Sequence, residues 1–429
     1  MKRRAFLKDI MAMGALGTLQ ASGALTLMGC APGNGNNPET PNPDAYDFDE
    51  ILDRSTTWSI KHLRAMQMGG DKIPMWIADM DFRTAPFMTQ AYRDRIALDA
   101  FGYTRTPQEF YDAVAQWETQ QHGWKVAPEW VTYVPGVITS MAQAILCFTE
   151  PGDKILLQPP VYDPFRGYTE RLGRVAVDNP LLLREGKYHM DLDHLESLID
   201  PQTKALILCN PHNPGGMMWG KEELQRLASI CAKHQLLVFS DEIHGDLALY
   251  GNQHVPFCSV SEEAARVGLI FTGPTKAFNL AGISTAHALI PNPELREKYI
   301  KHMEDRKLDE APIFSLISTI TAYTHPTHWL EALRTYLEGN IDYVAQFMQR
   351  EIPQIRVLKP QASFLVWLDC RELHLEQKAL VSLFLDKAGI VVNNGANYGP
   401  GGEGFIRLNI GCPRSIVEKA MQRLKQAIG

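Results

Sequence analysis

The stretch that decides the fold is residues 267–282, Val-Gly-Leu-Ile-Phe-Thr-Gly-Pro-Thr-Lys-Ala-Phe-Asn-Leu-Ala-Gly. The apolar residues from Val267 to Phe271 predict a buried strand, and the Thr-Gly-Pro-Thr turn after it delivers Lys276. A strand end and a stiff turn hold a lysine rigidly and remove part of its water, which a Schiff-base lysine requires. A lone lysine in a turn is more often plain surface, so the prediction depends on its companions.

The first companion is residues 238–244, Val-Phe-Ser-Asp-Glu-Ile-His, where an apolar strand over Leu236–Phe239 leads to Asp241. Ligands of open α/β sheets bind beyond the carboxyl ends of the strands. A carboxylate there keeps a pyridine nitrogen protonated, which makes the ring an electron sink. Asp241 could also be a helix N-cap, or one of four metal ligands with Glu242, His244 and Asp246, although no second His/Cys cluster stands at a diagnostic spacing.

The second companion is residues 205–216, Ala-Leu-Ile-Leu-Cys-Asn-Pro-His-Asn-Pro-Gly-Gly. It predicts a third buried strand that runs into a loop stiffened by two prolines. Asn213 has an amide that can donate to a phenolate oxygen, and Pro214 fixes its direction. Three successive strands therefore end in polar residues of complementary chemistry.

The motifs at 210–216, 240–244 and 276–282 resemble those of the class I/II aminotransferase family, in the family's order. Trp-Ile-Ala-Asp-Met-Asp-Phe at 76–82, together with Asp-Glu-Ile-His at 241–244, resembles its MalY/PatB-type C–S lyase branch, the cystathionine β-lyases. The resemblance covers the chain from about Tyr46 to the C-terminus. It implies pyridoxal 5'-phosphate (PLP) as cofactor and the type I α/β fold, with a large doubly wound, mostly parallel sheet domain and a smaller α/β C-terminal domain.

The resemblance also implies roles for single residues. Lys276 would bind the cofactor covalently, Asp241 would pair with its pyridine nitrogen, and Asn213 would contact its phenolate oxygen. Tyr162 matches the aromatic residue that stacks on the ring, although a core tyrosine would look the same in sequence. His244 stands where general aminotransferases commonly carry a tyrosine beside the phenolate oxygen.

The phosphate site is predicted at residues 135–140, Pro-Gly-Val-Ile-Thr-Ser, which open an apolar helix. The free amides of Val137 and Ile138 at its N-terminus suit an anion, and the family position agrees. The family often has serine at two positions beside the lysine, where this chain has Gly273 and Thr275. Thr275 keeps a hydroxyl donor, whereas Gly273 loses one.

Two further residues bear on the substrate and on assembly. Arg407 lies in an alternating stretch, which by itself predicts an outward-facing charge, but the family places its carboxylate-binding arginine here. Tyr103 matches the tyrosine that reaches the phosphate of the neighbouring subunit, so the resemblance implies a homodimer with shared active sites. The G-x-G-x-x-G pattern at 399–404 is not a dinucleotide motif, because it contains Pro400 and precedes a strand.

The N-terminus carries a separate signal. Arg3 and Arg4 precede a modestly apolar stretch, which resembles a Tat export signal. Leu-Met-Gly-Cys at 27–30 resembles a bacterial lipobox with Cys30 as the lipidated residue. A merely disordered N-terminus is the alternative. We expect an exported lipoprotein, periplasmic or at the cell surface, that contacts the membrane only through its lipid anchor.

The predicted organisation is a signal (1–30), a linker (31–45), an N-terminal arm packing on the small domain (46–80), a large PLP-binding domain (81–320) and a small C-terminal domain (321–429). The expected strands are 154–158, 205–209, 236–240, 269–272 and 286–290 in the large domain, and 363–368, 390–392 and 405–410 in the small one. With 429 residues, 45% of them hydrophobic, the chain can form two cores. The formal charge of -7 gives no case for nucleic-acid binding, and the cysteines show no metal spacing.

The function implied by the resemblance is a carbon–sulfur β-lyase. It would cleave cystathionine or cysteine S-conjugates to a thiol, pyruvate and ammonia. An amino-acid aminotransferase would use the same residues, and a PLP-bound interaction or regulatory protein is a third possibility.

Overall fold

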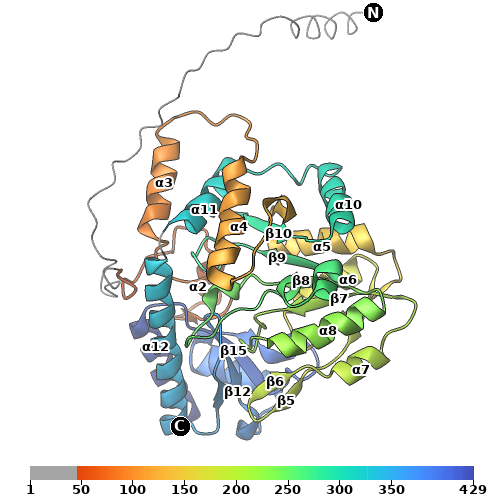
Figure 1. The fold of residues 1–429 in the computed structure, drawn as a ribbon. Coiled ribbons are helices and arrows are strands. Elements are labelled where there is room, and N and C mark those ends of the chain that lie inside the picture. Colours follow the sequence, from red (N-terminus) through yellow and green to blue (C-terminus); the bar gives the residue numbers. More distant parts are fainter. Residues whose placement is uncertain (1–45, 326) are drawn as a thin grey trace, which may run out of the picture. The chain divides into compact units, whose positions relative to one another are not determined.

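The structure is a computed structural model that describes residues 46–325 and 327–429 (Figure 1). Its largest element is a seven-stranded sheet of order β2-β10-β9-β8-β7-β3-β4. Strand β10 runs antiparallel to both neighbours, and the other pairs are parallel. The strands are β2 (Val131–Val134), β3 (Lys154–Leu157), β4 (Val175–Asp178), β7 (Thr203–Cys209), β8 (Leu237–Asp241), β9 (Gly268–Thr272) and β10 (Ala286–Leu289). The predicted doubly wound, mostly parallel sheet is confirmed.

Helices cover both faces of this sheet, and alternate residues of its strands pack into two different cores. In β7, Leu206 and Leu208 belong to one core, whereas Ala205 and Ile207 belong to the other. The helices that contribute side chains to the first core include α4 (Gln108–His122), α8 (Lys221–Lys233) and α11 (Ile313–Thr324), and those of the second include α5 (Val137–Phe148), α6 (Pro164–Arg171) and α10 (Pro293–Glu304). Burial on both faces explains why these strands read as continuous apolar runs in the sequence.

A second, antiparallel sheet has the order β11-β12-β15-β14. Its strands are β11 (Arg356–Leu358), β12 (Leu365–Asp369), β14 (Asn393–Asn394) and β15 (Phe405–Asn409). The remaining α-helices and strands are α2 (Ile60–Gln67), α3 (Pro86–Ile96), α7 (Leu192–Ser197), α9 (Glu262–Val267), α12 (His328–Glu351), α13 (Gln377–Ser382), α14 (Arg414–Ile428), β1 (Ile73–Pro74), β5 (Leu182–Arg184), β6 (Lys187–His189) and β13 (Ile390–Val391).

The strand expected over residues 390–392 is present as β13, but it lies outside the second sheet. Strand β13 pairs in parallel with β1 of the N-terminal segment, and β14 takes the position beside β15. Ile390 and Val391 are buried, as their apolar character indicates. Apolar character predicts burial of a strand, but it does not identify the strand with which it pairs.

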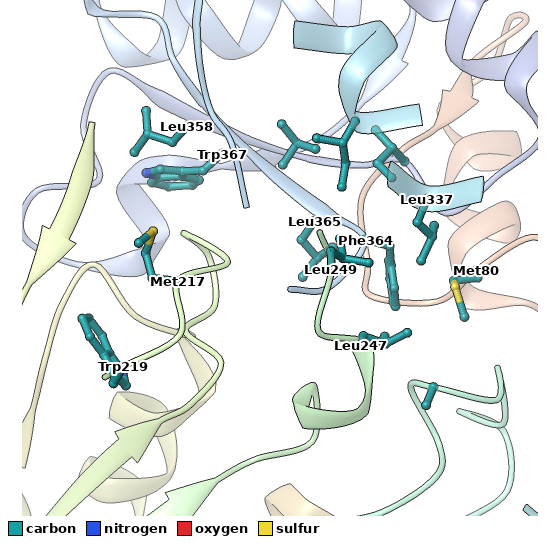
Figure 2. Close-up of a cluster of buried hydrophobic side chains, with 14 of the residues drawn as sticks. Met80, Met217, Trp219, Leu247, Leu249, Leu337, Leu358, Phe364, Leu365 and Trp367 are labelled. Atoms are coloured by element: carbon teal, nitrogen blue, oxygen red, sulfur yellow. The ribbon is translucent and has the colours of Figure 1, made fainter. Parts of the chain in front are cut away.

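The two sheets share one hydrophobic core. Figure 2 shows Leu247 and Leu249, which follow β8, in the same cluster as Phe364 and Leu365. The backbones also meet there, since Ser363 N donates to the Leu247 oxygen at 2.9 Å and Leu249 N donates to the Gln361 oxygen at 2.8 Å. The chain that leaves β8 is therefore fixed to the second sheet within a few residues.

A buried ion cluster holds the N-terminal segment in place. Lys61, 1% exposed, donates to a carboxylate oxygen of Asp81 at 2.7 Å and to the Asp79 carbonyl oxygen at 2.9 Å. Burial opposes ionisation of Asp81, but Lys61 and His62 outweigh it and lower its pKa to about 2. On the other side, Asn409 Nδ2 donates to the carbonyl oxygens of Ile77 and Asp79 at 2.7 and 2.8 Å. Residues 77–81 therefore have a fixed path.

Within the described ranges, no helix combines the length and the apolar character needed to cross a membrane. The predicted signal (1–30) and linker (31–45) lie outside these ranges. The domain boundaries at 80 and 320 stay predictions.

Candidate active site

The carboxyl ends of three adjacent strands form the base of the site. Cys209 of β7 pairs with Asp241 of β8, and Asp241 pairs with Phe271 of β9. The segments that carry Asn213 and Lys276 therefore leave the sheet on either side of Asp241. This is the arrangement that the three sequence motifs predicted.

Asp241 is the last residue of β8 and is 5% exposed. One of its carboxylate oxygens accepts a hydrogen bond from Ile243 N at 3.1 Å. Burial raises its pKa to about 7, although the Ile243 amide and the charge of Lys276 oppose the shift. The next helical turn, Gly245–Leu247, begins after His244, so Asp241 is not its N-cap.

Lys276 is partly buried in the turn after β9, and its Nζ donates to the Ala78 carbonyl oxygen at 2.6 Å. Burial lowers the pKa of this amine, and the charges of Asp79 and Asp241 act in the opposite direction. A lysine with a lowered pKa has a larger neutral fraction, which a nucleophile or a base needs. Asp79 lies in the segment 77–81, which is fixed by the hydrogen bond from Lys61 to the Asp79 carbonyl oxygen.

Arg407 is 3% exposed in the middle of β15, so its predicted alternative as an outward-facing charge is wrong. Its Nη1 donates to Asn213 Oδ1 at 2.9 Å and its Nη2 to Asn393 Oδ1 at 2.8 Å. Its guanidinium also lies 5.4 Å from the ring centre of Tyr398. Its buried Nε has no hydrogen-bond partner among the described residues.

Asn213 is 7% exposed, and its amide oxygen is engaged by Arg407. The amide NH₂ is therefore the end of this side chain that is left to donate. The structure thus joins Asn213 and Arg407, which are 194 residues apart in the sequence.

Tyr162 and His244 are uncharged aromatic side chains at this site. Burial raises the pKa of Tyr162 to about 12, and the charges of Arg407 and Asp241 act on it in opposite directions. Burial, Lys276 and Arg407 lower the pKa of His244 to about 3. The His244 Nδ1 is buried without a hydrogen-bond partner in the described part of the chain. Both rings are therefore neutral. Tyr162 interacts electrostatically with Arg407 and Asp241, and His244 with Lys276 and Arg407.

Helix α5 begins at Val137, directly after Gly136, whose φ of 147° suits glycine. The first backbone bond of the helix is from Ser140 N to the Gly136 oxygen, 3.0 Å. The amides of Val137, Ile138 and Thr139 precede that bond and point out of the helix N-terminus, which favours an anion.

The structure gives a physical reason for Gly273 in the turn that carries Thr275 and Lys276. A Cβ at position 273 would come 2.9 Å from Ala286 Cα of β10, closer than real Cβ contacts allow. The neighbouring strand therefore excludes a serine here. Thr275 remains the hydroxyl-bearing residue of the turn.

Two predicted site residues are not brought to this cluster. Tyr103 is fully exposed and lines a groove of about 1350 Å³, and none of the other predicted site residues lines that groove. Cys30 lies outside the described residues.

The alternative metal site is not assembled. Glu242 and Asp246 bond to His254 and His122, away from Asp241. In residues 46–325 and 327–429 no group of three or more His, Cys, Asp or Glu side chains is arranged to hold a metal ion.

Sequence reasoning gave no role to three residues that contact the predicted ones. Ala78 acts through its carbonyl oxygen, which no side-chain pattern reveals, although its motif at 76–82 was identified. Asn393 and Tyr398 meet Arg407 only because β14 pairs with β15 and the chain then turns back. The two adjacent asparagines at 393–394 were the only sequence feature that could have indicated a polar partner for Arg407.

A buried carboxylate and a lysine at the carboxyl edge of a doubly wound sheet, with an arginine from a second sheet, define an enzyme of the type I fold that handles amino acids. The family model described as aminotransferase class I and II matches residues 71–424, and the chain belongs to this family.

Some of the similar proteins are named as cystathionine beta-lyases and others as transaminases. The chain is 40% identical to cystathionine beta-lyase PatB of Bacillus subtilis, over 89% of this chain and 100% of that protein. It is 33% identical to protein MalY of Escherichia coli, over 89% and 99%. The crystal structure of cystalysin from Treponema denticola, which contains a pyridoxal 5'-phosphate cofactor, aligns with a TM-score of 0.86 and 31% identity, covering 89% of this chain and 98% of that one.

The raised pKa of Asp241 gives a prediction for the protein without cofactor. Its carboxyl is ordinarily ionised above about pH 4, so the folded state binds this proton more tightly and loses stability as the pH rises towards 7. Asp241→Asn removes that loss. We expect the free energy of unfolding of Asp241→Asn, minus that of the wild type, to be about 3 kcal/mol larger at pH 8 than at pH 5. Urea unfolding at the two pH values measures this difference. The exposed Asp193→Asn should show no such difference, and equal effects of Asp241→Asn at both pH values would contradict the assignment.

Proposed function

We propose that this chain is a PLP-dependent carbon–sulfur β-lyase that cleaves cystathionine or other cysteine S-conjugates. The observation that carries the proposal is the meeting of Lys276, Asp241 and Arg407 at one sheet edge, in a chain 40% identical over its family region to a cystathionine beta-lyase. The products are a thiol, pyruvate and ammonia, with one water consumed.

The residues of the site fit PLP. Asp241 has a carboxylate with only the Ile243 amide on it, so it can accept the proton of a pyridine nitrogen. The amides at the start of α5 suit the phosphate, and the Asn213 NH₂ suits the phenolate oxygen. Tyr162 supplies a neutral ring for stacking, and His244 an imidazole with an unpartnered Nδ1.

When bound, PLP supplies an electron sink for negative charge at the substrate Cα. Arg407 holds the substrate carboxylate with its free Nε, and Asn213 and Asn393 fix the plane of the guanidinium. With the cofactor bound, the Lys276 amine would be the base that takes the Cα proton. The pair of electrons left at Cα then expels a thiolate from Cβ. Hydrolysis of the remaining three-carbon enamine gives pyruvate and ammonia.

An aminotransferase would use the same residues, because it differs only in where a proton is returned. The motif at 76–82 resembles that of the C–S lyase branch, and a relative 40% identical to this chain is named a cystathionine beta-lyase. We therefore place the lyase first, the aminotransferase second and a regulatory protein that binds PLP third.

The protein is proposed to be a homodimer with shared active sites. Tyr103 is fully exposed in one chain, and Leu98 and Phe101 close to it are 69% and 58% exposed. Three large exposed apolar or aromatic side chains within six residues favour a covered surface. The resemblance of Tyr103 to the tyrosine that reaches the phosphate of the neighbouring subunit also supports a second copy on this surface.

The exported, lipid-anchored state of the protein is also a proposal. It rests on Arg3 and Arg4, on the Leu-Met-Gly-Cys motif that ends at Cys30, and on the order in which they occur. Tat export moves folded proteins, so PLP would be loaded before export.

The lyase is tested with purified protein and L-cystathionine, by measuring pyruvate and free thiol. We expect them in equal amounts, and a loss of both in Lys276→Ala, which removes the amine. Alanine with 2-oxoglutarate serves as the competing assay. If glutamate formation from alanine is faster than cystathionine cleavage, the protein is an aminotransferase and the lyase proposal is wrong.

The shared site is tested by co-expressing Lys276→Ala and Tyr103→Phe chains. Lys276→Ala alone should be inactive, and Tyr103→Phe alone should be weakly active. Random dimers should restore about a quarter of the wild-type activity, because half of them are mixed and each mixed dimer holds one intact site. Activity no greater than the average of the separate variants would show that Tyr103 does not act across an interface.

The anchor is tested by Cys30→Ala, which should abolish labelling by a fatty-acid probe and release the protein from membranes. Arg3→Lys with Arg4→Lys should keep the enzyme in the cytoplasm. Cys147→Ala, a cysteine outside the motif, is the control and should change neither result. Unlabelled wild-type protein in the soluble fraction would refute the lipobox.

A further inference from the structure

The loop after β8 carries different side chains on its two sides. Asp241 and His244 feel the charge of Lys276, whereas Glu242 and Asp246 bond to histidines in the opposite direction. Successive residues at a strand end point to opposite faces, which explains the separation of Asp241 from Glu242. The chemistry assigned above uses only the first side.

Glu242 is 3% exposed and has a donor on each carboxylate oxygen. Oε1 accepts from Ser240 Oγ at 2.7 Å and from Phe257 N at 2.9 Å, and Oε2 contacts His254 Nε2 at 2.7 Å. A carboxylate this deep is stable only where such partners are supplied. Its position is therefore fixed by three separate groups.

The backbone of Glu242 also links the two strands that carry Asp241 and Lys276. Glu242 N donates to the Phe271 oxygen at 2.9 Å, and Thr272 Oγ1 donates to the Glu242 oxygen at 3.1 Å. Thr272 is the last residue of β9, four residues before Lys276. A shift of Glu242 therefore changes the position of Asp241 relative to Lys276.

Asp246 fixes the other end of the loop. Its Oδ1 accepts from Trp117 Nε1 at 2.9 Å and contacts His122 Nε2 at 3.0 Å, both on α4. Its carbonyl oxygen accepts from Arg334 Nε and Nη2 on α12, at 3.0 and 2.6 Å. Residue 246 is thus held by helices α4 and α12, whereas the side chain of residue 242 is held by residues 240, 254 and 257.

The two acid–histidine pairs form one packed cluster. The rings of His122 and His254 meet edge to face at 5.2 Å. A Cβ on Gly245 would come 2.8 Å from the His254 ring, so the loop lies directly on that imidazole. The other ionisable side chains that interact electrostatically with this cluster are Asp241, Cys258, Glu118, His287, Tyr323 and Arg334. Burial and the charge of Glu242 raise the pKa of Asp241 and of Cys258.

We propose that Glu242 and Asp246 are positioning residues, which hold the loop from behind and thereby set Asp241 against the pyridine nitrogen and at a fixed place relative to Lys276. This inference rests on the proposed use of PLP. It assigns a task in the reaction to a buried cluster that contacts no reacting atom.

The test compares Glu242→Gln with Arg174→Gln in the full chain loaded with PLP. Arg174 is 7% exposed and donates from Nε to Thr149 Oγ1 at 2.8 Å. It precedes β4, at the amino ends of the parallel strands, so it is a buried polar control at the opposite edge of the sheet. Three quantities are measured for each variant: the melting temperature, the pH midpoint of the absorption change of bound PLP, and kcat and KM for cystathionine.

Both variants should melt at lower temperature. Only Glu242→Gln should shift the spectral midpoint, by about half a pH unit or more, and lower kcat by about 10-fold to 100-fold with KM nearly unchanged. If Glu242→Gln loses thermal stability alone, as the control does, the cluster is merely structural and the proposal is wrong.

Thr272→Val decides the matter on the same readouts if Glu242→Gln does not fold, because it removes only the hydroxyl that bonds to the Glu242 oxygen. Its failure to shift either quantity would overturn the proposal. The spectral midpoint also distinguishes a failure of the positioning role from a failure of the proposed lyase function. A protein that binds PLP without cleaving cystathionine would refute the lyase, while the midpoint would still test the positioning role.

Discussion

Burial of the seven-stranded sheet on both faces is the constraint on which the rest of the structure depends. It favours apolar residues in the middle of β7, β8 and β9, and the polar side chains of these strands lie at or near their ends. Because the three strands are parallel neighbours, their carboxyl ends share one edge. Asn213, Asp241 and Lys276 meet there although the sequence separates each from the next by about thirty residues.

Concentrating ionisable groups at this edge opposes stability, and the surrounding contacts limit the loss. Burial disfavours the charged form of Asp241, and it also disfavours the charged form of the Lys276 amine. The compensation comes from segments distant in sequence. Asn213 and Asn393 hold Arg407, and Lys61 holds the part of the N-terminal segment whose Ala78 oxygen accepts from Lys276. Hydrogen bonds that join the two sheets and the N-terminal segment therefore stabilise the surroundings of the site.

The sequence predicted those features that are local in the chain. Apolar runs followed by Asn213, Asp241 and Lys276 identified the central strands and the edge at which they end, and the order of the motifs identified the family. Long-range features were not predictable in this way. Alternation around Arg407 suggested an exposed charge, because its partners on β14 and in the loop after β7 are known only from the fold. The pairing of β13 with β1 and the role of a backbone oxygen at Ala78 leave no pattern in side chains.

Gly273 shows how the antiparallel strand β10 constrains the cofactor turn. The turn passes so close to β10 that a side chain at 273 would collide with the Ala286 backbone, not with a flexible group. A hydroxyl-bearing side chain at this position could not be introduced by one substitution, since the strand itself would have to move. A larger residue at position 273 therefore requires a different path of β10. In an engineered chain, or in a relative that carries serine here, the residue and the strand position must change together.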